Sequence, residues 1–194
     1  MPSRPVPSTP MQAEPGEAEQ QAITRASSRV SSRRPRFTTQ LAADADGRIA
    51  KIGPDHADHD GWMARLQDLF GTRGTAFAIS QLNHVLGLVK SGGQFDRVKA
   101  NALLAVVEAA EPANEVEAAL ALQMAITHEM ALQALARAQR VDQIGQYDSA
   151  GNMAVKLLRT YMMQLEALAR LRRGGEQVVR VVHVHPGAQA VVGT

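Results

Sequence analysis

Two histidines near the end of the chain have a spacing that could bind a metal ion. His183 and His185 lie in the valine-rich segment VVRVVHVHPG, and residues two apart on a β-strand project to the same face. Two neutral imidazoles at this spacing could ligate zinc if further ligands completed a tetrahedral site. The alternative is that both are polar, strand-compatible residues lining a pore or rim. We favour the second interpretation and expect no cofactor.

A second histidine cluster, DHADHD at 55–60, places His56 and His59 among three aspartates. Histidines three apart on a helix could share a metal ion with one carboxylate. Acidic residues are also favoured at helix N-termini, where they interact with the helix dipole. We therefore interpret this cluster as the solvated start of a helix.

The sequence contains none of the common catalytic motifs. A phosphate-binding P-loop, a G-x-S-x-G nucleophile elbow and an H-E-x-x-H metal motif are all missing from it. The glycine turn GTRGT at 71–75 does not follow a predicted strand, which argues against phosphate binding. We expect a protein that is not an enzyme.

Composition limits the class of protein further. The 194 residues are enough for one domain with tails, and the formal net charge is only +2. Cysteine is not used at all, which rules out disulfides and thiolate metal sites and fits a cytoplasmic location. No run of 18 apolar residues occurs, so we expect no membrane partner.

The first 55 residues are rich in Pro, Ser, Arg and Glu and have few large apolar side chains, a composition typical of a disordered arm. Within it, residues 21–40 carry five arginines and no acidic residue. This run resembles an organelle transit peptide and equally a generic basic arm. Its arginines could neutralise nucleic-acid phosphates without reading base sequence: Arg25, Arg29, Arg33, Arg34 and Arg36.

Residues 56–173 are predicted to form a helical domain, because apolar residues recur at helical spacing between polar caps. The expected helix starts are Asp60, Thr75, Asp96, Asn114 and Asp148. A helix of about thirty residues follows Asn114, and the short link after it makes the next helix its antiparallel neighbour. The sequence thus predicts a mainly α fold with a long helix hairpin at 114–173.

Alanine dominates this hairpin, so each contact between its helices buries little apolar area, and neighbouring subunits offer further burial. The last helix has a seam at three-to-four spacing that we assign to oligomerisation: Leu157 (or Leu158), Tyr161, Leu165 and Leu168.

Residues 174–194 are predicted to form a C-terminal β-strand or hairpin. Val179, Val181 and Val184 favour a strand, and Pro186–Gly187 suits a type II turn. A two-stranded ribbon is marginal alone in water, and we find no other convincing strand in the sequence. We therefore expect this ribbon to pair between subunits of a homo-oligomer.

The region from about residue 97 to the end resembles a family of uncharacterised proteobacterial helical proteins. The resemblance lies in VEAAEPANEVEAALALQMAITHEMAL, DSAGNMAVKLLRTYMMQLEAL and, above all, GGEQVVRVVHVHPGAQAVVG. Relatives are expected to have Gly-Gly in place of 186–188, and Asn as often as His at His185. This resemblance implies no catalytic residues.

The layout of basic arm, helical hairpin and C-terminal strand also resembles that of phage small terminase subunits, in architecture alone. The sequence therefore leads us to expect a self-assembling structural or adaptor protein of bacterial, phage or mobile-element origin. The alternative is a DNA-binding packaging subunit similar to a small terminase.

Overall fold

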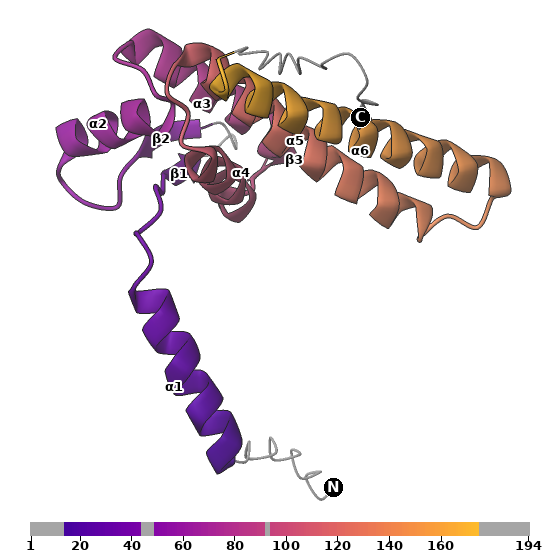
Figure 1. Cartoon of the computed structure of the whole chain (residues 1–194), viewed down its shortest axis with the longest axis horizontal. Helices are drawn as coiled ribbons and strands as arrows, with labels where there is room; N and C mark the ends of the chain where they lie inside the picture. Colours follow the sequence, from indigo (N-terminus) through magenta and orange to yellow (C-terminus); the bar gives the residue numbers. More distant parts are fainter. Residues whose placement is uncertain (1–13, 44–48, 92–93, 175–194) are drawn as a thin grey trace, which may run out of the picture. The chain divides into compact units, whose positions relative to one another are not determined.

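The computed structural model describes residues 14–43, 49–91 and 94–174 (Figure 1). The chain divides into two units, residues 1–36 and residues 37–194. Within the described residues there are six α-helices and four short strands, so the expected mainly α fold is confirmed. The predicted C-terminal ribbon, including Val179, Val181, Val184, His183 and His185, lies outside the described residues.

The first unit contains one helix, α1 (Glu17–Ser31), where the sequence analysis predicts a disordered arm. That prediction is wrong for these residues. Every residue of α1 is exposed, so no apolar burial supports the helix within its unit. Its hydroxyl groups satisfy backbone carbonyls instead: Thr24 Oγ1 donates to the Gln20 carbonyl oxygen, and Ser28 and Ser31 repeat this contact four residues back.

The second unit begins at Phe37, so the predicted boundary of the arm at residue 55 is also wrong. Phe37 is only 1% exposed, and its ring centroid lies 5.6 Å from that of Trp62. Its backbone N–H donates to the buried carboxylate of Glu108 over 2.9 Å. Thr39 is buried as well, and its backbone exchanges two hydrogen bonds with the Asn101 amide. These contacts fix the start of the unit against the helices.

Four short strands, located between helices in the sequence, form two antiparallel pairs. Strand β1 (Gln40–Ala43) pairs with β2 (Ile49–Gly53), and β3 (Lys90–Ser91) pairs with β4 (Gln94–Phe95). The statement that no strand exists outside the C-terminal ribbon is therefore wrong. The expectation that the ribbon pairs between subunits was based on the lack of any other strand in the chain, and that basis is removed.

Three helices supply most of the core, α2 (His59–Leu69), α3 (Thr75–Val89) and α4 (Arg97–Ala110), and the next helix along the chain adds residues from its first half. The N-cap of α2 is Asp58 rather than Asp60, since Asp58 Oδ1 accepts from Gly61 N. Gly74 rather than Thr75 precedes α3. Asp96 caps α4 as predicted, accepting from Lys99 N over 2.9 Å.

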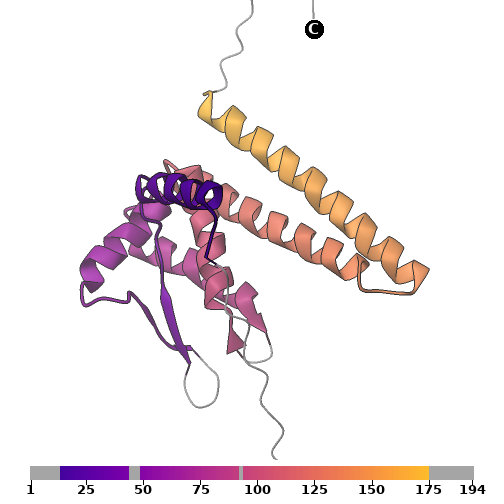
Figure 2. The ribbon, with the colours of Figure 1, turned by 90° about the horizontal axis from the view of Figure 1, so that it is seen from below.

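The hairpin consists of α5 (Glu115–Ala138) and α6 (Ile144–Arg172), antiparallel neighbours as predicted, and it projects beyond the other helices of its unit (Figures 1 and 2). Asn114 caps α5 by accepting from Val116 N and Glu117 N. The predicted thirty-residue helix ends earlier, at Ala138, and α6 starts at Ile144 rather than at Asp148. Packing places α5 between α6 and the core helices α3 and α4.

Replacing Phe37 tests whether residues before the predicted domain belong to the core. Phe37→Ala removes a fully buried ring, so we expect a loss of about 3–4 kcal/mol in the free energy of unfolding. Urea unfolding followed by circular dichroism measures it. The control is Val30→Ala on α1, where Val30 is 65% exposed and the change should stay within about 0.5 kcal/mol. Equal stability of the two variants would contradict the assignment.

Candidate functional site

The histidine cluster at 55–60 is used for local structure. His56 Nδ1 accepts from Asp58 N, while Asp58 caps α2 and the His59 ring lies beside Gly53. In the described part of the chain, no three His, Asp or Glu side chains are grouped to hold a metal ion. The expectation of a solvated helix start therefore agrees with the local geometry.

The predicted phosphate-binding arginines divide between α1 and the segment that follows it. Arg25 and Arg29 are one helical turn apart on α1, and Arg33 continues the same row just beyond the helix end. Arg34 and Arg36 lie in the extended segment before Phe37. The helix therefore presents two of these cations on one side, and Arg33 follows shortly after its C-terminus.

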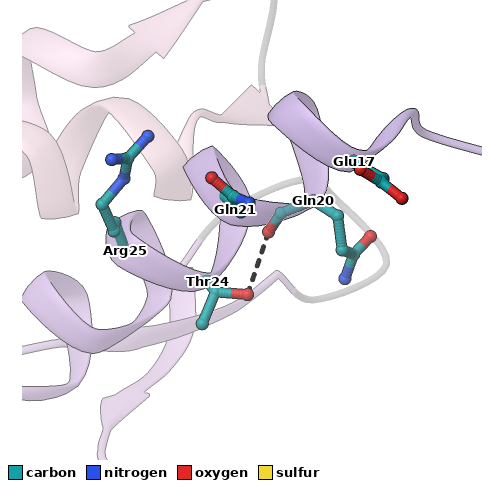
Figure 3. A pocket seen from close by; sticks show the side chains of 5 residues that line it. All are labelled: Glu17, Gln20, Gln21, Thr24 and Arg25. Atoms are coloured by element: carbon teal, nitrogen blue, oxygen red, sulfur yellow. Dashed lines mark hydrogen bonds between the residues drawn. The ribbon is translucent and has the colours of Figure 1, made fainter.

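A shallow surface region lies on the N-terminal half of α1. Figure 3 shows its five lining side chains, all from this one helix: Glu17, Gln20, Gln21, Thr24 and Arg25. A single helix supplies only one wall, so this region cannot enclose a ligand. Within it, Thr24 Oγ1 donates to the Gln20 backbone carbonyl oxygen (Figure 3).

The predicted oligomerisation seam lies against α5 of the same chain. Leu168 is buried, and Leu157, Tyr161 and Leu165 are half-buried. The ring centroids of Tyr161 and His128 of α5 are 5.4 Å apart. The seam thus contributes to closing the hairpin, and its assignment to contacts between subunits stays a prediction.

An ion pair at the base of the hairpin fixes the end of α6. The Arg172 guanidinium donates to Glu117 Oε2 over 3.0 and 3.1 Å, and to the backbone carbonyls of Ala110 and Glu111. Glu117 is 6% exposed and also accepts from Ala113 N. One arginine therefore joins α6 to the corner between α4 and α5.

A second ion pair joins α4 to the middle of α5. Lys99 Nζ lies 2.9 Å from Glu129 Oε1, and both side chains are partly exposed. The hydrogen bond from Lys99, with a second from Gln133, lowers the pKa of the Glu129 carboxyl below its ordinary value. This ion pair fixes the position of α5 relative to α4 and leaves the flanks of the hairpin uncovered.

Large apolar side chains remain exposed along one side of the hairpin, which we term the apolar face. It comprises Leu132 and Leu135 of α5 with Ile144, Tyr147, Val155, Leu158 and Met162 of α6, exposed by 38% to 79%. Helical spacing places Leu132 and Leu135 in the row of His128, and Leu158 in the row of Tyr161. Because His128 contacts Tyr161, the two sets lie on the same side of the hairpin.

The other side of the hairpin holds a groove of about 560 Å³. It is lined by Met130, Gln133, Ala134 and Arg137 of α5 and by Gly145, Gln146, Ser149, Ala150, Met153 and Leu157 of α6. This lining is mixed, with amides, a hydroxyl and a guanidinium among the apolar groups. The two sides of the hairpin thus differ in chemistry, and the apolar face is the stronger candidate for burial.

Sequence reasoning missed the apolar face, although its signal is present in the chain. Leu158 was named only as an alternative to Leu157, and the row it begins includes Val155 and Met162. Among the described residues, no helix is both long and apolar enough to cross a membrane. Comparison with protein-family models, curated proteins and solved structures finds no match to this chain.

Replacing Arg172 should destabilise the fold, because the buried Glu117 carboxylate would lose its ion-pair partner. We expect Arg172→Met to lower the free energy of unfolding by about 2–3 kcal/mol, less than for a fully buried pair because Arg172 is partly exposed. Chemical denaturation provides the measurement. Arg173→Met removes an exposed arginine one residue away and should be nearly neutral. Coincident unfolding curves for the two variants would argue against the anchoring role.

Proposed function

We propose that this protein is a self-assembling structural or adaptor protein whose hairpin is the assembly element. The observation that carries the proposal is the apolar face: seven large apolar side chains exposed on one side of a projecting hairpin. Together they expose on the order of 600 Å², the upper end of the largest apolar patch on a typical monomer. Burial of such a surface is the favourable step that assembly supplies.

The proposed role in assembly follows from the position of the apolar face on the projecting hairpin. The hairpin extends away from the core helices, so a partner can cover its side without disturbing the contacts among α2, α3 and α4. The fold thus separates a stabilising core from a binding element. A bacterial, phage or mobile-element context is part of the same proposal and is supported by the layout of the chain alone.

Light scattering across a concentration series tests assembly. We expect the wild-type mass to exceed the 20.9 kDa of one chain, and Leu132→Asp/Leu158→Asp to weaken association by at least about tenfold. The reason is that a carboxylate buried in an apolar contact loses its hydration.

Met163→Asp is the matched control, because Met163 is 67% exposed and lies on the outward side of α6, away from the apolar face. Its mass should equal that of the wild type. A wild-type protein that stays at 20.9 kDa at every concentration would overturn the proposal.

Nucleic-acid binding through α1 is the second candidate function. It is favoured by Arg25 and Arg29, one turn apart on a helix with no buried residue, and by Arg33 just after the helix end. A helix of 15 residues is marginally stable alone in water, so a partner that neutralises its cations would also stabilise it. Such contacts would be to phosphates and would not depend on base sequence.

Filter binding to duplex DNA at several salt concentrations tests this candidate. We expect Arg25→Ala/Arg29→Ala/Arg33→Ala to reduce the slope of log affinity against log salt by about 2–3, since each phosphate contact contributes about 0.9. The control, Arg140→Ala/Lys156→Ala/Arg159→Ala, removes the same charge from the hairpin. Equal slopes for both triple variants would exclude α1 as the binding element.

A further inference from the structure

We propose that the apolar face binds the same face of a second copy, with the two α6 helices antiparallel about a two-fold axis near Leu158. This inference rests on the proposed function and specifies its partner and geometry. In such a contact both hairpins contribute two helices, so the interface is a four-helix arrangement. The steps below derive the partner from the pattern of α6, its charges and its side-chain sizes.

One flank of α6 carries an unbroken apolar stripe whose members are three or four residues apart, all of them exposed except the half-buried Gly151 and Leu165. Its members are Ile144, Tyr147, Gly151, Val155, Leu158, Met162, Leu165 and Ala169. This spacing is the seam of a coiled coil, in which each side chain inserts between residues of a facing helix. No charged residue interrupts the stripe over the length of α6. The stripe therefore suits a long, straight helix as its partner.

Charges beside the stripe favour an antiparallel partner of the same sequence. Asp148 lies in the second turn of α6, Arg170 lies in its last turn, where it also pairs with the exposed Glu166, and Arg173 caps the helix; Asp148, Arg170 and Arg173 are all exposed. An antiparallel pair places Asp148 of one copy near Arg170 of the other, twice over. A parallel pair would instead bring like charges together at both ends, which is unfavourable.

The sizes of the stripe residues fix the register. With Leu158 at the two-fold axis, the full length of α6 overlaps with its copy, and Val155 faces Met162. In this register Gly151 faces Leu165 and Tyr147 faces Ala169, so small side chains oppose large ones. Alternation of this kind lets two helices interdigitate without voids. In this register every member of the stripe from Ile144 to Ala169 lies against the helix of the second copy.

The exposed area agrees with a dimer contact. The apolar face exposes on the order of 600 Å², and a standard interface buries about 800 Å² on each partner, of which a little over half is apolar. Leu132 and Leu135 add the contribution of α5 on the same side. The groove on the other side has less apolar surface to bury and includes Arg137, so it is the weaker candidate for a symmetric contact.

Cysteine cross-linking tests the geometry directly, because the natural chain contains no cysteine. Leu158→Cys should form a disulfide-linked dimer under mild oxidation, since the axis brings the two Cβ atoms within disulfide reach. Met163→Cys, on the outward side of α6, should not cross-link. An equimolar mixture of Asp148→Cys and Arg170→Cys should give mixed dimers, with neither variant linking to itself.

A charge exchange provides a second measurement on proteins with no added thiol. We expect Asp148→Arg and Arg170→Asp each to weaken dimerisation several-fold, and the double variant to restore it. Circular dichroism confirms that each variant is folded. Restoration in the double variant supports direct pairing, whereas an additive loss would contradict it.

The outcomes separate this inference from the proposal on which it rests. If the wild type assembles but Leu158→Cys does not cross-link, assembly stands and the antiparallel contact is overturned. Self-linking of Asp148→Cys would show a parallel pair and would overturn it as well. Occupation of the face by the C-terminal segment or by another protein would leave the purified chain monomeric, which contradicts both proposals.

Discussion

The close contact between α5 and α6 is the constraint from which the exposed surface follows. Its buried residues are largely alanine: Ala121, Ala131 and Ala138 on α5, and Ala150 and Ala154 on α6. Alanine allows two helix axes to approach closely, but each methyl group buries little area. Some larger side chains still pack between the helices, with Leu168 buried and Leu157 and Tyr161 half-buried. Others lie along the flank, where Leu158 and Met162 of α6 remain exposed.

The helices could be predicted from the sequence because their apolar periodicity is local, but the start of the folded unit could not. The segment 37–53 has few large apolar residues, so its composition matches that of a disordered arm. It is held by the buried Phe37 and by a backbone hydrogen bond to Glu108, 71 residues further along the chain. A contact over that separation leaves no local pattern, and the strands that depend on it were missed for the same reason.

The sequence analysis placed the candidate assembly surface on the last helix but did not identify which side of that helix is exposed. The apolar residues of α6 cover a broad arc, and only part of that arc can face α5. Periodicity alone cannot distinguish the part that closes the hairpin, Leu157 and Tyr161, from the part that remains exposed, Leu158 and Met162. The distinction depends on which residues of α5 are small. The basic row of α1 was easier to recognise, because charge spacing needs no tertiary partner.

Assembly and phosphate binding would reinforce each other because they use separate units of the chain. A small number of arginines on and just after one short helix would bind phosphate weakly, and such binding declines steeply with salt. An assembly that presents several copies of α1 makes the second contact intramolecular, which raises the overall affinity without any new interaction. The apolar face would then govern nucleic-acid affinity while touching no nucleic acid. If each chain binds phosphate only weakly, a hairpin that joined copies of the chain would raise the affinity of the assembly.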